Sequence, residues 1–215
     1  MENLAEQHEK MIREQLVARN IDSPRLIYAF QRVPREAFVP ETLSASAYDD
    51  VPLPIGNNQT ISQPYIVAVM LDALQITPHD RVLEVGAGSG YAAALMSRLA
   101  REVYAIERIP ELADTATERL ARLDFSNVFV RQGDGSLGWP DHAPYDAILV
   151  SAGGPKAPPA LLSQLAVNGR CVVPVGPDEN SQELVKITRE GNSVFRREVL
   201  TEVRFVPLIG EQGWH

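Results

Sequence analysis

The sequence has a single cysteine, a deficit of positive charge and no long apolar run. Cys171 lies in the apolar segment CVVPV and has no partner for an internal disulfide, so we expect a buried, unreactive thiol. The 20 Lys and Arg residues against 28 Asp and Glu residues give a net charge of -8, which disfavours a nucleic-acid groove. No apolar segment is long enough to span a bilayer, and MENLAEQHEK lacks the features of a secretory signal. We therefore expect a cytoplasmic protein without a membrane or nucleic-acid partner.

The four histidines do not have the spacing of a metal site. His8 lies in a predicted helix, His79 and His142 lie in predicted loops, and His215 is the last residue. Each is expected at the surface. The sequence therefore predicts no metal cofactor.

The first third of the chain differs in pattern from the rest. Apolar residues at helical spacing predict an amphipathic helix over residues 2–18, and Ser23 before Pro24 predicts a capped second helix to about Gln31. Residues 48–64, YDDVPLPIGNNQTISQP, contain too many Pro, Gly, Asn and Asp residues for a helix or a central strand. They predict a long ordered loop, which in a compact domain usually has a function.

From residue 62 onward, helical and strand patterns alternate. Ser62 is expected to cap a helix that ends at Leu74. The later segments are strands at 81–86, 102–107, 128–132, 145–151 and 170–175, with helices near 89–100, 110–122 and 158–166. This order predicts a mostly parallel, doubly wound α/β sheet. Segments 183–189 and 199–208, around the Gly191-Asn192 turn, predict antiparallel C-terminal strands.

No segment resembles a linker, and the sequence predicts one domain over residues 1–215. Within it, residues 1–61 would form the helical N-terminal region and the loop, and residues 62–215 would form the core.

The most informative motif is VLEVGAGSG at residues 82–90. A β-branched run predicts a buried parallel strand, and Gly86, Gly88 and Gly90 allow a sharp turn close to a ligand before a helix at about Ser89. The spacing is G-x-G-x-G, because the position of the third glycine of dinucleotide-binding proteins is Tyr91. This difference favours S-adenosylmethionine as the ligand and disfavours a dehydrogenase.

Polar residues follow each predicted strand at the edge where an open parallel sheet binds its ligand. Glu84 precedes the glycines, and Glu107 can accept hydrogen bonds from both ribose hydroxyls. Asp134, between two glycines, could accept the adenine amino group, and residues 151–154 are small enough to leave room for a methyl donor. Each feature alone has an ordinary structural explanation, but their succession predicts a Rossmann-like class I methyltransferase fold that binds S-adenosylmethionine.

Longer segments carry a resemblance to a known family. PLPIGNNQTISQPYIVA at 52–68, VLEVGAGSGY, GDG, PYDAILVSAGGPKAPPALLSQL, NGRCVVPVG and VRFVPL resemble the protein-L-isoaspartate O-methyltransferases, from about residue 10 to residue 209. The resemblance implies methyl transfer from S-adenosylmethionine to the α-carboxylate of isoaspartyl residues in damaged proteins and peptides. The ester would then close to a succinimide and begin repair. We expect a monomer.

The resemblance also assigns the site residues. Ser62 is expected to be the catalytic residue, and Thr60, Ile61 and Ser62 would line the gap between donor and substrate. The expected cofactor-binding residues are Gln59, Thr60, Ile61, Ser62, Glu84, Gly86, Gly88, Gly90, Glu107, Arg108, Asp134 and Gly135.

Three positions depart from the family pattern. Asn58 stands where a glycine is usual, Tyr65 replaces the histidine of some members, and Ile209 stands where some members have a threonine near the cofactor. Asn58 can still adopt a left-handed backbone, so we expect the turn to form. Val206 and Leu208 are expected to lie near a bound peptide.

The chemistry requires no strong base, because a peptide α-carboxylate, with an ordinary pKa of about 3.3–3.7, is already ionised. Ser62 would therefore orient the substrate, unless it serves only as a helix cap.

Two other functions remain open: methylation of a small carboxylic acid, and a non-catalytic cofactor-binding adaptor. Methylation of nucleic acid is disfavoured, because SAGGP at 151–155 lacks the Asn/Asp-Pro-Pro-aromatic pattern and Cys171 is poorly placed to attack a pyrimidine.

Overall fold

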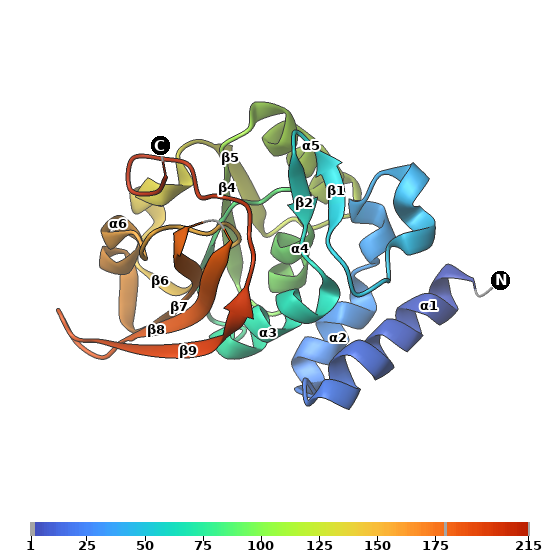
Figure 1. Ribbon diagram of the computed structural model, residues 1–215, viewed down its shortest axis with the longest axis horizontal. Helices are drawn as coiled ribbons and strands as arrows, with labels where there is room; N and C mark the ends of the chain where they lie inside the picture. Colours follow the sequence, from blue (N-terminus) through green and yellow to red (C-terminus); the bar gives the residue numbers. More distant parts are fainter. Residues whose placement is uncertain (1–2, 179, 215) are drawn as a thin grey trace.

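The computed structural model describes residues 3–178 and 180–214, and its centre is a seven-stranded sheet (Figure 1). The strands are β3 (Arg81–Val85), β4 (Glu102–Glu107), β5 (Val128–Gln132), β6 (Tyr145–Val150), β7 (Leu165–Asp178), β8 (Ser181–Arg189) and β9 (Phe195–Val203). The main helices are α1 (Leu4–Met11), α2 (Pro24–Arg32), α3 (Pro64–Leu74), α4 (Tyr91–Ser97), α5 (Pro110–Arg122) and α6 (Pro159–Ser163).

The strand order places β3 at the centre of the parallel part of the sheet. The order is β5-β4-β3-β6-β7-β8-β9; the five strands β3 to β7 are parallel, and β7, β8 and β9 pair antiparallel. The chain runs outward from β3 to β5 and then returns to β6 on the other side of β3. This reversal is where open α/β sheets bind ligands. The predicted fold class is confirmed.

Alternate residues of the strands build a core on each face of the sheet. Val82 packs with the N-terminal helices and with α3 and α4, whereas Leu83 packs with α6 on the other face. Cys171 belongs to the second core and is 1% exposed. The prediction of a buried cysteine is confirmed, and burial raises the pKa of its thiol to about 12, which disfavours the reactive thiolate.

The N-terminal helical region forms as predicted within the described residues. α1 continues through a π-helical turn (Ile12–Leu16) and a 3-10 turn (Val17–Arg19), and α2 covers the second predicted helix. Ser23 precedes α2, but its side chain makes no capping hydrogen bond, so that detail of the prediction is wrong. Pro24 at the first helical position reduces the need for a cap, because it has no N–H. Two further 3-10 turns follow at Arg35–Phe38 and Glu41–Ser46.

Residues 48–64 contain a β-hairpin, which corrects the prediction of a long loop. β1 (Leu53–Gly56) and β2 (Gln59–Ile61) pair antiparallel in a small sheet of their own, drawn in cyan in Figure 1. Asn57 and Asn58 form the turn with φ angles of 50° and 56°. Asparagine adopts this left-handed conformation more readily than most residues, so the expectation for Asn58 is confirmed.

Several element boundaries differ from the prediction. α3 begins at Pro64 with Gln63 at the cap position, so the predicted cap at Ser62 is wrong. α4 begins at Tyr91 because Gly90 still has a left-handed backbone. β9 ends at Val203, and the segment beyond it is not part of the strand. None of the described helices is long and apolar enough to cross a membrane.

Candidate active site

A cavity lies at the carboxyl ends of β3, β4 and β6, at the predicted edge of the sheet. β2 and the residues after it form one wall, α3 and α4 contribute side chains, and the C-terminal segment 206–209 forms another wall. The predicted site residues that line it are Gln59, Thr60, Ile61, Ser62, Glu84, Gly86, Gly88, Glu107, Arg108 and Gly135. Two predicted residues, Gly90 and Asp134, are not part of its lining.

The glycine loop depends on left-handed backbone angles. The φ angles of Gly86, Gly88 and Gly90 are 86°, 54° and 87°. A Cβ atom at Gly88 would also lie 3.2 Å from Cδ1 of Ile55, in the hairpin above the loop. Gly90 packs against Leu120 of α5, which explains why it stands outside the cavity.

Glu107 fastens this loop from the end of β4. Its Oε2 accepts a hydrogen bond from the backbone N–H of Gly88 at 2.8 Å, and its Oε1 accepts one from the N–H of Ile109 at 2.9 Å. Glu107 is only 6% exposed, yet it lines the cavity. A carboxylate has about four acceptor positions, so Glu107 can hold the loop and still accept hydrogen bonds from ribose hydroxyls.

Glu84 is a second buried acid at the same cavity. It is 1% exposed, and its Oε2 has no hydrogen-bond partner among the described residues. Burial, with a further contribution from Glu107, holds the pKa of this carboxyl well above its usual range, although bonds from the Ser151 hydroxyl and the Ala93 backbone oppose the shift. A carboxyl oxygen without a hydrogen-bond partner at a cavity fits a ligand that carries positive charge.

Asp134 has a different environment from the one predicted. Its Oδ1 accepts hydrogen bonds from the backbone N–H and hydroxyl of Ser136 at 2.9 Å and 2.7 Å, and its Oδ2 accepts one from the N–H of Glu211 at 2.8 Å. Partial burial raises the pKa of Asp134, but these hydrogen bonds outweigh it and the net pKa is lowered. Asp134 thus connects the C-terminal segment to the loop after β5, and its contact with adenine stays a prediction.

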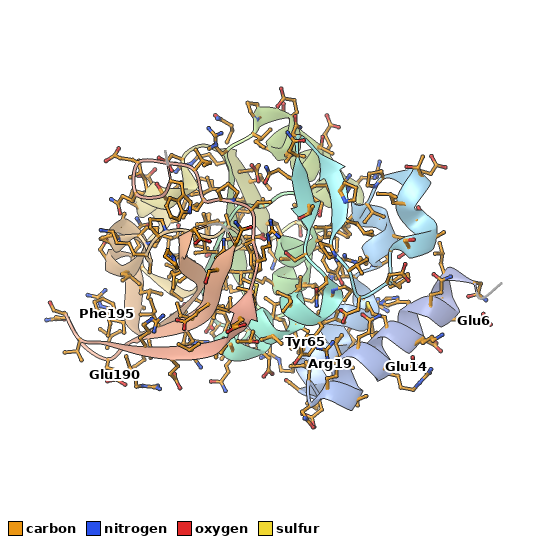
Figure 2. All side chains as sticks on the ribbon, viewed as in Figure 1. Glu6, Glu14, Arg19, Tyr65, Glu190 and Phe195 are labelled. Atoms are coloured by element: carbon orange, nitrogen blue, oxygen red, sulfur yellow. The ribbon has the colours of Figure 1, made fainter. Side chains whose placement is uncertain are left out.

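One wall of the cavity comes from the end of the hairpin. β2 carries Thr60 and Ile61, and Ser62 follows before α3 begins, so all three line the cavity. Tyr65 is not part of the lining: the guanidinium of Arg19 lies 3.1 Å from its ring centroid, and Figure 2 shows the two residues together beside α2. Asp50 connects both, because it accepts hydrogen bonds from the Arg19 side chain and the Tyr65 backbone. Tyr65 therefore contacts the N-terminal region through Arg19 and Asp50, outside the cavity lining.

The sequence did not identify the apolar part of the lining. Val67 and Met70 of α3, Tyr91 of α4 and Leu149 of β6 all line the cavity. Their spacing is that of ordinary core residues, so no sequence signal separated them from the core.

The C-terminal segment reaches the cavity through Val206, Leu208 and Ile209, and the contact of Val206 and Leu208 with a bound peptide stays a prediction. The backbone of Gly153 holds it: its carbonyl accepts hydrogen bonds from the Leu208 N–H at 2.7 Å and from the Trp214 indole at 3.0 Å.

The chain that builds this cavity matches one family along almost its whole length. The sequence model of the protein-L-isoaspartate(D-aspartate) O-methyltransferases matches residues 6–213. This chain belongs to that family. It is 57% identical over 212 residues to protein-L-isoaspartate O-methyltransferase 1 of Rhodopseudomonas palustris strain HaA2, covering 99% of this chain and 86% of that protein. It is 53% identical over 204 residues to the protein-L-isoaspartate O-methyltransferase of Protochlamydia amoebophila, covering 95% and 97% of the two chains.

Solved structures of the family have the same fold. A protein-L-isoaspartate O-methyltransferase superposes with a TM-score of 0.87 at 28% identity, covering 96% of this chain and 67% of that chain. A Plasmodium falciparum protein described as a protein-L-isoaspartate O-methyltransferase superposes with a TM-score of 0.82 at 25% identity, covering 97% and 99%, and was solved with S-adenosyl-L-homocysteine.

Proposed function

We propose that this chain transfers a methyl group from S-adenosylmethionine to the α-carboxylate of L-isoaspartyl residues in damaged proteins and peptides. This is the activity of the family to which it belongs, and the methyl ester begins repair through a succinimide. One observation carries the assignment to these residues: the glycine loop and the Thr60–Ser62 segment line a single cavity from different sides.

The donor side of the cavity is formed by the glycine loop, Glu84, Glu107 and Arg108. When bound, S-adenosylmethionine supplies an electrophilic methyl group on a sulfonium. Glu107 would hold the ribose hydroxyls with the acceptor positions that the Gly88 and Ile109 backbones leave free. Gly86 and Gly88, without side chains, would leave room for the nucleoside against the loop.

On the acceptor side, the site must orient the substrate carboxylate and exclude water. A carboxylate nucleophile is ionised at neutral pH, and its reaction with a sulfonium cancels charge, so apolar walls favour the transfer. Val67, Met70 and Leu208 supply such walls. Ser62 would orient the carboxylate; the absence of a helix-capping role at this position supports that assignment.

We also propose a single-domain, cytoplasmic monomer that binds neither nucleic acid nor membranes. The net charge of -8 supports the lack of a nucleic-acid partner. Met11 and Leu16 of the N-terminal region share one hydrophobic core with Val82 of the central strand, which supports one domain.

The direct test uses labelled S-adenosylmethionine and two peptides that are identical except for aspartate in one and isoaspartate in the other. Base-labile label is expected on the isoaspartyl peptide alone. Label on neither peptide would contradict the proposal and favour a small carboxylic acid or a non-catalytic adaptor.

In the same assay, Ser62→Ala is expected to lower kcat for the isoaspartyl peptide by about tenfold to a hundredfold, because one oriented hydrogen bond to a charged group is lost. Affinity for S-adenosylmethionine is expected to change by less than about threefold. An unchanged rate at saturating peptide would remove Ser62 from the mechanism.

A further inference from the structure

Two acids face one cavity, but only one of them has its oxygens paired. Both oxygens of Glu107 accept backbone hydrogen bonds, whereas Oε2 of Glu84 has no partner in the described part of the chain. Glu84 lies in the central strand β3, is 1% exposed and lines the cavity. A buried carboxylate with one unpaired oxygen is unfavourable when it is ionised, and a protein either neutralises such a group or supplies a cation.

Among the described residues, no cationic side chain acts on Glu84. The neighbours that act on it are Glu107 of β4, the hydroxyl of Ser151 after β6 and the backbone N–H of Ala93 in α4. Arg108 and Tyr91 line the same cavity but are not among these neighbours. The one charged neighbour, Glu107, repels a negative charge on Glu84. Without a ligand, the local electrostatics therefore favour protonated Glu84.

We propose that Glu84 selects the charged methyl donor: it is protonated in the empty site and releases its proton when the cationic end of S-adenosylmethionine enters the cavity. The inference rests on the proposed function, which places this donor in the cavity. A positive charge beside Glu84 replaces the proton as the neutralising partner, so donor and proton compete for one carboxylate. A neutral nucleoside thioether offers no such charge and leaves Glu84 protonated. Glu84 thus discriminates by charge between molecules that share the same adenosine.

This competition fixes the direction of the pH dependence. Because the bound state holds fewer protons than the empty state, affinity for S-adenosylmethionine rises as pH rises toward the pKa of empty-site Glu84. Affinity for 5′-deoxy-5′-methylthioadenosine, which keeps the adenosine and the sulfur but has no charged group, is independent of pH over the same range.

The test is titration calorimetry of the whole chain at several pH values from about 5 to 8, in two buffers with different ionisation enthalpies, which gives the number of protons exchanged. The wild type is expected to release protons when S-adenosylmethionine binds, approaching roughly one per molecule bound as pH falls below the pKa of empty-site Glu84, and to release none with 5′-deoxy-5′-methylthioadenosine. Glu84→Gln is expected to release none with either ligand. It should bind S-adenosylmethionine about tenfold to a hundredfold more weakly and the neutral thioether within about threefold of the wild type.

Glu102→Gln is the matched control. Glu102 lies at the other end of the neighbouring strand β4, bonded to Arg81, and is not part of the cavity. This variant is expected to release the same number of protons as the wild type. Proton release that persists in Glu84→Gln, or no release from the wild type with S-adenosylmethionine, would overturn the inference. Peptide methylation by the wild-type preparation distinguishes the two proposals. If only the proposed function fails, the protein releases protons when S-adenosylmethionine binds but does not methylate the isoaspartyl peptide. If only the inference fails, the peptide is methylated without this proton release.

Discussion

Glu107→Ala is expected to weaken the binding of S-adenosylmethionine by at least about a hundredfold. The carboxylate accepts hydrogen bonds from the backbone N–H groups of Gly88 and Ile109, and each hydrogen bond to a charged group is worth about 1.5–3 kcal/mol. The substitution releases the glycine loop and removes the acceptor for ribose. Because 1.4 kcal/mol is a factor of ten, the loss of two hydrogen bonds from the ribose hydroxyls to this carboxylate gives the expected magnitude. Equilibrium dialysis with labelled S-adenosylmethionine measures it.

Glu102→Ala provides the comparison on the same strand. Its carboxylate is paired with Arg81 and Arg101 and is partly exposed, so its removal should change donor affinity by less than about threefold. Unaltered donor binding by Glu107→Ala would show that Glu107 neither holds the loop nor contacts the donor.

Gly135→Ala is expected to destabilise the fold by about 1–3 kcal/mol and to weaken donor binding. Gly135 has no left-handed φ, but a Cβ atom there would lie 2.5 Å from Cγ1 of Val85. Val85 is buried in β3, and its β-branched side chain has little rotamer freedom to move away. Both residues line the cavity, so any adjustment changes its shape. Urea denaturation measures the free energy of unfolding.

Gly133→Ala is the matched variant two residues earlier in the same loop. A Cβ atom at Gly133 would have its nearest neighbours at 3.9 Å, an ordinary contact distance. The free energy of unfolding should change by no more than about 0.5 kcal/mol. Equal losses in the two variants would contradict the steric explanation and would implicate the backbone freedom of the whole loop.

The parallel part of the fold could be predicted from the sequence because its signals are local. The strands at β4 and β5 and the helix α5 match their predicted ranges, since each is bounded by clear changes of hydrophobic period. The glycine loop was predictable for a similar reason: three closely spaced glycines after a buried strand require a turn that other residues resist.

The parts that the sequence did not predict depend on distant partners. The hairpin β1–β2 has only short strands, and one of them contains Pro54, so its strand character came from pairing and not from local preference. The Asp134 bond to Glu211 joins residues 77 positions apart, and no local pattern announces such a contact. The sequence could not decide whether Ser62 caps the helix α3. Proline is tolerated in the first turn of a helix, so Pro64 allows a cap at either Ser62 or Gln63.

The most direct measurement is a crystal structure of this chain with S-adenosyl-L-homocysteine and an isoaspartyl peptide. The ribose hydroxyls are expected within hydrogen-bond distance of Glu107, with the sulfur facing the Thr60–Ser62 segment and the isoaspartyl carboxylate bonded to Ser62. A ligand bound away from the glycine loop, or a sulfur that faces away from Ser62, would contradict the account.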